Sequence, residues 1–404
     1  MSVRVAITGL GALSALGPDV AAHLKAFRAG TVGIGTTRCL PVEQFKSKIS
    51  AEVHDFRPEA HFEPRQLGML DRAAQFAVVA SRQALADAGP VLEGLAPERA
   101  GAIFAAAIGY HAMEEGYQKL YIANAARPHP FTVPRAMPSA PLSHVTMDAG
   151  IRGPAFSIAS ACSSAAHAIG TAFQMVRSGM LDVAVAGGSE APLTFGMMKC
   201  WEALRVLSAD ACRPFSKDRS GLVLGEGAAA VVLENLDRAR ARGATIHAEI
   251  IGFGMSADAL DMTAPDTESA ARAVALALKD AGLAPDRVDY VNAHGTATAL
   301  NDRTETAALR RVFGAHLDRL PVSSTKSMYG HCMSAAAALD LVASVLAVRE
   351  GFLPPTMGFN APDPDCAIDC VPNAARPAAL EVAISNAFAF GGLNAVLAVR
   401  RYEG

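Results

Sequence analysis

The sequence lacks an excess of charge of either sign. Its 404 residues include 36 Lys and Arg against 39 Asp and Glu, which gives a formal net charge of −3 at pH 7. Nucleic acids and anionic membrane surfaces attract proteins with a pronounced basic excess. We therefore expect no nucleic acid partner.

An uninterrupted apolar run long enough to span a bilayer is also missing, because such a helix needs about 20 residues. Asp340 interrupts the stretch AAAALDLVASVLAV. At the N-terminus, VAITGLGALSALG follows Arg4 and has the length of a signal-peptide core, but its glycines and the following Pro18 favour a strand, a turn and a helix start. The sequence predicts no membrane span.

Cysteine is scarce and irregularly spaced, with seven residues at positions 39, 162, 200, 212, 332, 366 and 370. An odd number without the rhythm of a disulfide scaffold is typical of reduced thiols, so we expect a cytoplasmic location. Cys366 and Cys370 lie in DPDCAIDC, where two loop or strand thiols are a better interpretation than half of a metal site. We expect no metal ion.

Long polar tracts and internal repeats of 20–50 residues are absent, which excludes disorder and a solenoid. Because single hydrophobic cores stop growing near about 250–300 residues, a chain of 404 residues predicts two fused halves. We place the division near residue 255, which gives halves 1–254 and 255–404.

Short β-rich apolar runs alternate with Ala- and Leu-rich helical stretches, which predicts a layered α/β fold. The predicted strands are 3–8, 102–106, 155–159, 182–186, 228–233, 249–252, 290–293, 382–385 and 395–399. The predicted helices are 19–29, 72–88, 163–178, 268–281, 302–312 and 335–349. Each half therefore has a similar supply of both.

The run AFSIASACSSAAHAIG predicts a buried strand, a tight turn and a helix that begins at or just after Cys162. The positive end of a helix dipole favours a thiolate, so we expect the pKa of this thiol to fall below its usual value of about 8.5. A buried structural cysteine among small residues is the alternative, and for an isolated cysteine it is the more common one.

Two histidines strengthen the reactive interpretation. YVNAHGTAT places His294 just after an apolar strand, and STKSMYGHCM places Lys326 and His331 in a second glycine-containing loop before a helix. A lone histidine is usually structural. Two histidines in strand-exit loops and Cys162 in a third loop form a candidate site, because open α/β sheets bind ligands beyond their strand ends.

With the C-terminal SNAFAFGGLNA, these loops resemble the motif order of elongating (type II, Cys-His-His) β-ketoacyl-[acyl-carrier-protein] synthases. The resemblance covers essentially the whole chain, from VAITGLGALSALG through PFSKDRSGLVLGEGAAAVVLE to Phe390 in FAFGG. It implies the thiolase fold, a duplicated αβαβα five-layered sandwich, and a homodimer. The Cys162 half and the half with both histidines would be its two repeats.

The resemblance also implies a reaction. Cys162 would take an acyl chain from an acyl carrier protein, and the backbone N–H groups of Cys162 and Phe390 would form the oxyanion hole. His294 and His331 would hydrogen-bond the thioester carbonyl of malonyl-carrier protein, so that loss of CO₂ leaves an enolate. The enolate would attack the Cys162 thioester, which is a decarboxylative Claisen condensation that extends the chain by two carbons.

Further residues match supporting positions of the family. Lys326 matches the lysine beside the histidines and Glu305 its expected ion-pair partner, with an ordinary buried salt bridge as the alternative. Thr296 and Thr298 match threonines that bind the phosphopantetheine arm, which arrives on the carrier protein, so no cofactor is expected. Phe390 matches a gating residue. Acyl-tunnel positions, some across the dimer interface, are matched by Ile108, Thr132, Val133 and Trp201, and basic carrier-contact positions by Arg65, Arg127 and Arg205.

The sequence also departs from the family pattern. Ala389 and Leu393 replace Gly and Thr of the usual GFGGTN loop, which predicts a stiffer gate. Ser334 and Ala337 stand where glycine is usual, and Trp201 where a smaller aromatic is common. We expect these changes to affect chain-length preference rather than the reaction.

Related enzymes provide the alternatives. A thiolase needs a second cysteine in the C-terminal glycine loop, initiating and chalcone-type synthases have Asn in place of His331, and a chain-length factor lacks the nucleophile. A heterodimer with a chain-length-factor-like paralogue remains an alternative to the homodimer. The C-terminal motifs look more similar to nodulation-type synthases, which make specialised acyl chains, than to the housekeeping enzyme, and primary fatty-acid synthesis remains open.

Overall fold

The structure is a computed structural model that describes residues 3–404, and its central feature is a ten-stranded mixed sheet. The strand order is β10-β9-β13-β14-β8-β1-β7-β6-β4-β5. The strands of the first half are β1 (Val5–Ser14), β4 (Ala100–Ala105), β5 (Ala155–Ile158), β6 (Val183–Glu190) and β7 (Gly227–Asn235). Those of the second half are β8 (Ala248–Ala257), β9 (Tyr290–Asn292), β10 (Val322–Ser323), β13 (Val382–Ala389) and β14 (Leu393–Arg400).

The two halves of this sheet repeat one topology. In the first half β4 lies parallel to β5 and β6, and β7 pairs antiparallel with β6 and β1. In the second half β9 lies parallel to β10 and β13, and β14 pairs antiparallel with β13 and β8. Short antiparallel pairing between β1 and β8 joins the halves. The chain is therefore a duplicated α/β unit.

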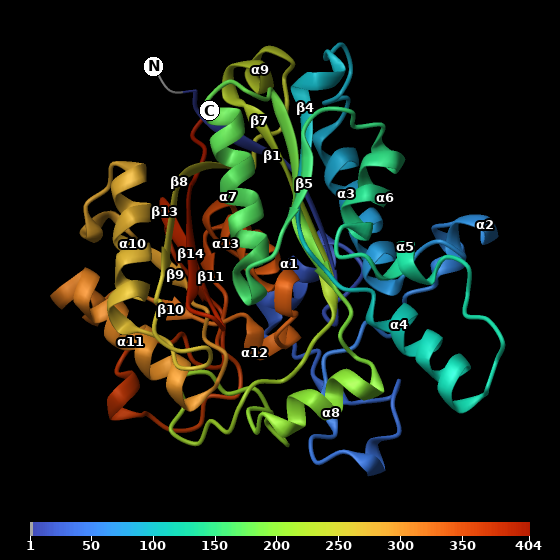
Figure 1. The fold of residues 1–404 in the computed structure, drawn as a ribbon. Coiled ribbons are helices and arrows are strands. Elements are labelled where there is room, and N and C mark those ends of the chain that lie inside the picture. Colours follow the sequence, from blue (N-terminus) through green and yellow to red (C-terminus); the bar gives the residue numbers. More distant parts are fainter. Residues whose placement is uncertain (1–2) are drawn as a thin grey trace.

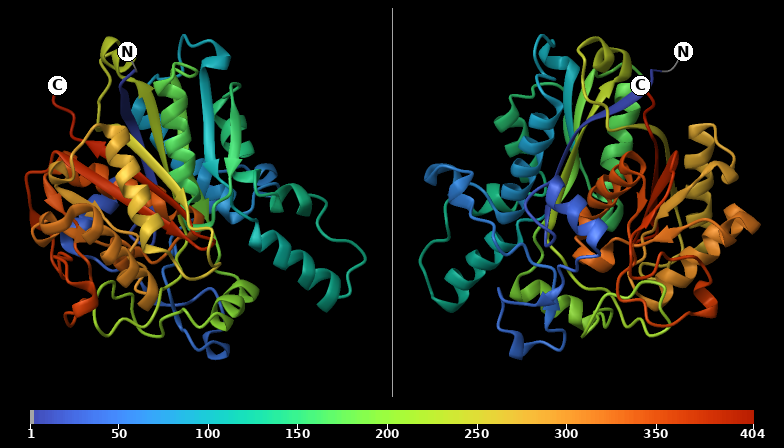
Figure 2. Two further views of the ribbon diagram at one scale, coloured as in Figure 1. Left: turned by 60° about the vertical axis from the view of Figure 1, so that its left-hand side comes forward. Right: turned by 180° about the vertical axis from the view of Figure 1, so that it is seen from behind.

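Helices cover both outer faces and fill the space between the halves (Figures 1 and 2). Helices α3 (Arg72–Ala88) and α6 (Ala140–Ala149) pack on the first half, and α10 (Thr267–Ala281) and α11 (Ala299–Phe313) on the second. Helices α7 (Ser164–Arg177) and α13 (Ala336–Glu350) lie between the halves and contact each other. The layers follow the order α-β-α-β-α, which confirms the five-layered thiolase fold.

All the predicted strands and helices are present, but strands β1, β6, β8 and β13 were predicted to be too short. Gly9 and Gly11 do not end β1, which continues to Ser14. A Cβ at these positions would lie 2.0 Å and 1.9 Å from the backbone oxygens of Ala84 and Ala80 in α3. The glycines therefore allow helix and strand backbones to approach closely.

The elements that prediction missed are mostly short or on the surface. They comprise helices α2 (Pro64–Leu67), α4 (Tyr110–Tyr117), α5 (Thr132–Ala136), α8 (Phe195–Ala203), α9 (Leu236–Ala241) and α12 (Lys326–Tyr329), and strands β2 (Gly35–Thr36), β3 (Ile49–Ser50), β10 (Val322–Ser323), β11 (Phe352–Leu353) and β12 (Arg376–Pro377). The predicted helix 19–29 is α1 (Val20–Ala29).

Helices α4 and α5 and their connecting loop form an arm that projects from the body near β5, the edge strand of the sheet (Figures 1 and 2). In the described chain, no helix combines the length and apolarity needed to cross a bilayer. The division predicted between 254 and 255 falls within β8 and stays a prediction.

Candidate active site

Cys162 lies in a short 3₁₀ turn, Ala161–Ser163, directly before α7. Ala161 has a φ of 50°, so the chain leaves β5 through a left-handed residue before the helix begins. Serines satisfy the turn, because Ser163 Oγ donates to Ser160 O at 2.8 Å and Ser164 Oγ to Ala161 O at 2.7 Å. The predicted order of strand, turn and helix is confirmed, but the strand is not buried, because β5 is an edge strand and its Phe156 is 40% exposed.

The predicted fall of the Cys162 pKa is wrong. Burial raises the pKa of this thiol to about 11, because a thiolate loses hydration in the apolar interior. The positive charge of Lys326 and hydrogen bonds from the backbone N–H groups of Phe390 and Cys162 lower the pKa, but by less than burial raises it. The two N–H groups expected to form the oxyanion hole therefore do lie against the sulfur.

His294 follows β9 in a loop that Glu305 holds in place. The two carboxylate oxygens of Glu305 accept hydrogen bonds from the backbone nitrogens of His294 and Gly295, each at 2.8 Å, and Asn386 Nδ2 donates to Oε1 at 3.0 Å. Gly295 has a φ of 36°, and a Cβ there would lie 2.5 Å from Ser324 Cβ. Glu305 thus orients the His294 loop.

The expectation that Glu305 pairs with Lys326 is wrong. Lys326 Nζ forms a fully buried ion pair with Asp340 Oδ2 at 2.5 Å. Oδ1 of Asp340 accepts from Tyr329 Oη at 2.6 Å and from Thr325 Oγ1 at 3.2 Å. Asp340, the one charged side chain in the buried part of α13, is the partner because α12 packs against α13, while Glu305 already accepts hydrogen bonds from backbone donors.

The two histidines lie together at the end of the sheet. Their rings meet edge to face, with centroids 5.4 Å apart and an interplanar angle of 85°. Burial lowers the pKa of His331 to about 3, with a further contribution from Lys326, and lowers that of His294 well below its usual value, with contributions from Lys326 and His331. Both rings are therefore neutral near pH 7, and each neutral ring carries one N–H donor.

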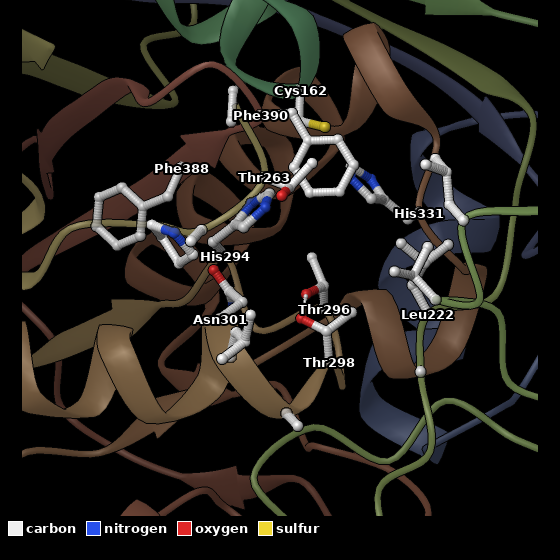
Figure 3. A pocket seen from close by; sticks show the side chains of 18 of the residues that line it. Cys162, Leu222, Thr263, His294, Thr296, Thr298, Asn301, His331, Phe388 and Phe390 are labelled. Carbon is white, nitrogen blue, oxygen red and sulfur yellow. Dashed lines mark hydrogen bonds between the residues drawn. The ribbon is translucent and has the colours of Figure 1, made fainter. Parts of the chain in front are cut away.

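Cys162, His294 and His331 all line one cavity of about 460 Å³ (Figure 3). Thr296 and Thr298 also line this cavity, with their hydroxyl oxygens 3.0 Å apart. Other lining residues include Trp201, Leu204, Arg205, Arg219, Leu222, Met262, Asn301, Ala389 and Phe390. The sequence therefore predicted the residues at the reactive end of the cavity and missed most of its wall.

The predicted acyl-tunnel residues divide into two groups. Trp201 lines the cavity, whereas Ile108, Thr132 and Val133 lie on or beside the arm, outside the cavity wall formed by this chain. Ile108 is 39% exposed and Val133 is 73% exposed. Among the predicted basic contacts, Arg205 lies at the cavity, and Arg65 and Arg127 lie on the surface away from it.

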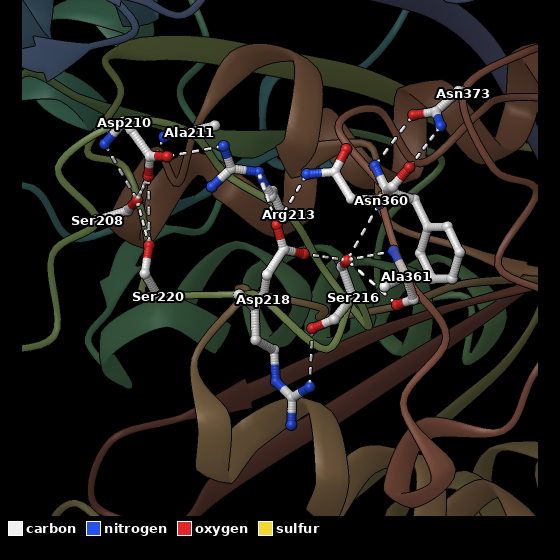
Figure 4. Close-up of polar contacts among 12 residues, drawn as sticks. Ser208, Asp210, Ala211, Arg213, Ser216, Asp218, Ser220, Asn360, Ala361 and Asn373 are labelled. Carbon is white, nitrogen blue, oxygen red and sulfur yellow. Dashed lines mark hydrogen bonds and ion pairs between the residues drawn. The ribbon is translucent and has the colours of Figure 1, made fainter.

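A polar network holds the segment 208–222, whose residues 219–222 line the cavity (Figure 4). Ser216 Oγ accepts from the backbone nitrogens of Asn360 at 3.1 Å and Ala361 at 3.2 Å. Asn360 Nδ2 donates to Asp218 at 2.8 Å, and Arg213 donates to Asp210 at 2.7 Å. The polar residues of PFSKDRSG thus tie this wall to the loop that follows β11.

Phe390 stands at the tip of the hairpin between β13 and β14. Ala389 pairs with Leu393 across the hairpin, so the two departures from the family motif are cross-strand neighbours. Gly391 and Gly392 have φ values of 81° and 69°, which glycine adopts without strain. Ala389 belongs to the regular strand, and the predicted stiffer gate stays a prediction.

Two family models match the chain, "Beta-ketoacyl synthase, N-terminal domain" over residues 2–239 and "Beta-ketoacyl synthase, C-terminal domain" over residues 247–360. The chain belongs to the β-ketoacyl synthase family. The first match contains Cys162 and the second contains both His294 and His331. The synthase is therefore a condensing acyltransferase that extends fatty-acyl or polyketide chains.

Relatives and solved structures agree over the full length. The synthase is 47% identical to "Nodulation protein E" of Rhizobium sp. (strain N33), over 99% of this chain and 100% of the relative. It is 41% identical to "3-oxoacyl-[acyl-carrier-protein] synthase 2" of Coxiella burnetii, over 98% of each chain. A structure titled "The ishigamide ketosynthase/chain length factor" matches with a TM-score of 0.94 and 35% identity, over 100% of both chains.

Proposed function

We propose that Cys162, His294 and His331 carry out the condensation in this synthase, because these three side chains line one buried cavity. The Cys162 sulfur attacks the carbonyl carbon of an acyl thioester on the carrier protein. The C–S bond to the pantetheine sulfur breaks, and the departing thiolate takes the proton of Cys162. The N–H groups of Cys162 and Phe390 bind the oxygen that becomes negative in this step.

Decarboxylation follows on the same face of the cavity. The neutral imidazoles of His294 and His331 each donate an N–H to the thioester carbonyl of malonyl-carrier protein. The bond to the carboxylate breaks, CO₂ leaves, and the electron pair forms an enolate that the two donors stabilise. The enolate carbon then bonds to the acyl carbon, the C–S bond to Cys162 breaks, and the Cys162 thiolate that leaves takes a proton from solvent to regenerate the thiol. Burial, which keeps both rings neutral, supports this assignment.

Lys326 acts behind the histidines rather than on the substrate. It forms a buried pair with Asp340, and its charge lowers the pKa of both imidazoles and of the Cys162 thiol. Thr296 and Thr298 line the approach to the reactive end and bind the phosphopantetheine arm. The arm arrives on the carrier protein, so the synthase needs no resident cofactor or metal.

We infer a homodimer for this synthase. Strand β5 is an edge of the sheet, and the neighbouring arm exposes large apolar side chains, with Tyr121 76% and Ile122 77% exposed. A second copy paired at this edge would cover the arm and bring the partner's arm toward the acyl chain. A heterodimer is the second candidate, because one matching structure is titled as a ketosynthase/chain length factor. Co-purification of a paralogue without the cysteine would favour the heterodimer.

The relatives suggest a specialised substrate. Similarity to nodulation protein E over the whole chain supports a specialised acyl chain ahead of primary fatty-acid synthesis. The seven cysteines are all free thiols, which supports a cytoplasmic location.

Intact-mass measurement tests the nucleophile. After incubation with acyl-carrier proteins of several chain lengths, we expect one acyl adduct on the wild-type synthase and none on Cys162→Ala. Cys200→Ala, which removes an exposed thiol outside the cavity wall, is the matched control and should acylate normally. Equal adduct formation on Cys162→Ala would show that the assignment of the nucleophile is wrong.

A further inference from the structure

Trp201, the single tryptophan of the chain, stacks on Phe390. The ring centroids are 6.0 Å apart and the planes differ by 22°. Both residues line the cavity that contains Cys162, and the backbone N–H of Phe390 hydrogen-bonds the Cys162 thiol. The stack therefore links the cavity wall to the segment that touches the proposed nucleophile.

The Trp201 side of this stack is held firmly. Trp201 lies near the C-terminal end of α8 (Phe195–Ala203). At the start of this helix, both carboxylate oxygens of Glu114 accept backbone hydrogen bonds, from Phe195 and Gly196, each at 3.1 Å. Next to Trp201, Glu202 accepts from the backbone nitrogen of Ser47 at 3.0 Å. Helix α8 is thus anchored at both ends by carboxylates.

On the Phe390 side, two consecutive glycines give the backbone more conformational freedom than helix α8 has. Phe390 precedes Gly391 and Gly392, which both have positive φ values, and Gly391 N donates to Met262 O at 2.7 Å. Met262 itself is 72% exposed, so Gly391 bonds to a surface segment, whereas Gly392 O accepts a hydrogen bond from the backbone nitrogen of the buried Asp258 at 2.9 Å. Glycine pairs of this kind absorb backbone rotation at low cost.

We propose that Trp201 is the positioning residue against which Phe390 closes beside Cys162, and that opening this stack limits the rate at which an acyl chain reaches the thiol. The proposal rests on the proposed roles of Cys162 and Phe390. Aromatic pairs of this geometry shift an equilibrium about two- to tenfold. Removing the indole ring while keeping an apolar side chain should therefore accelerate acylation by about that factor.

The single tryptophan reports directly on the stack. Octanoyl-pantetheine is mixed with the wild-type synthase, while Trp emission is followed by stopped flow and acylation by quenched-flow intact mass. We expect the emission to change at the rate of acylation in the wild type. It should not change in Cys162→Ala, which takes no acyl group, nor in Phe390→Leu, which takes the acyl group but has no ring to unstack.

Two variants test the rate. Trp201→Leu should acylate about two- to tenfold faster than the wild type, and Trp201→Phe, which keeps a ring, should restore most of the wild-type rate. Three results would overturn the proposal: constant emission in acylated wild type, the same emission change in Phe390→Leu, or an unaltered or slower rate in Trp201→Leu. Absence of any acyl adduct in the wild type would instead contradict the proposed function itself.

Discussion

The two central helices, α7 and α13, begin with the same backbone conformation but carry different side chains at their starts. Helix α7 follows a 3₁₀ turn whose first residue, Ala161, has a φ of 50°. Helix α13 follows an equivalent turn, Met333–Ala335, whose first residue has a φ of 44°. The middle residue of the first turn is Cys162 and that of the second is Ser334. The duplicated fold thus offers one helix start in each half.

The side chains at these two helix starts have different environments. Cys162 lines the cavity, whereas Ser334 Oγ donates to Ser189 O at 3.2 Å and its backbone nitrogen donates to Glu190 at 3.3 Å. The strand exits differ in the same way: β9 leads into His294, whereas the equivalent β4 leads toward Ile108 and the apolar arm. One half therefore supplies the nucleophile and an apolar surface, and the other supplies the hydrogen-bond donors.

The largest expected effect concerns the donors of the second half. His294→Ala and His331→Ala should each lower release of labelled CO₂ from malonyl-carrier protein by about 10²–10⁴-fold, because the enolate loses a donor. Acylation of Cys162, measured by intact mass, should persist. The double variant should lose little more than either single one, since the residues act as a unit.

His316→Ala is the control for this pair, because His316 binds Val288 O on the surface of the second half and should leave both steps unchanged. Loss of acylation with normal decarboxylation in either active-site variant would contradict the assignment of decarboxylation to the two histidines.

The next effect concerns the buried pair behind the histidines. Asp340→Asn leaves Lys326 without a counter-charge in the interior, and we expect the free energy of unfolding to fall by about 3–5 kcal/mol. Denaturant unfolding measures the loss. Glu381→Gln, in an ion pair with Arg287 that is more than half exposed on both sides, is the control and should cost under about 1 kcal/mol. Equal losses would show that the buried pair is dispensable.

The sequence predicted the positions of the reactive side chains better than it predicted the partner of Lys326. Strand and helix periodicity, together with motif order, were enough to place Cys162, His294 and His331, because each follows a well-marked strand or opens a strong helix. The partner of Lys326 depends on how α12 packs against α13, which no local pattern records. Asp340 was visible in the sequence as a lone charge in an apolar helix, and such a charge requires a buried partner.

The pKa of Cys162 was mispredicted for a related reason. A helix start is a local feature that sequence shows, whereas burial depends on the whole fold, and here burial has the larger effect. The same limit applies to Ile108 and Val133, whose environment depends on what covers the arm.

A third, smaller effect tests this burial directly. With a pKa of about 11, only a small fraction of Cys162 is thiolate at pH 8, so its alkylation by iodoacetamide should be slow. The rate should rise about tenfold for each pH unit from 7 to 10 without levelling off, because the pKa lies above this range. Peptide mass analysis follows Cys162 specifically. A plateau near pH 8 would mean that the helix dipole affects the pKa of Cys162 more than burial does.

In the last experiment we expect no acylation at all. It tests whether the turn before α13 can present a nucleophile as the turn before α7 does. The variant Cys162→Ala/Ser334→Cys moves the thiol from the first turn to the second and replaces the Ser334 hydroxyl. If backbone geometry alone made a nucleophile, the new thiol would be acylated. We expect no adduct by intact mass, because the side chain at 334 faces Ser189 and Glu190 and does not line the cavity. Far-ultraviolet circular dichroism matching Cys162→Ala controls for folding, and an acyl adduct on residue 334 would show that the second half retains a usable acyl site.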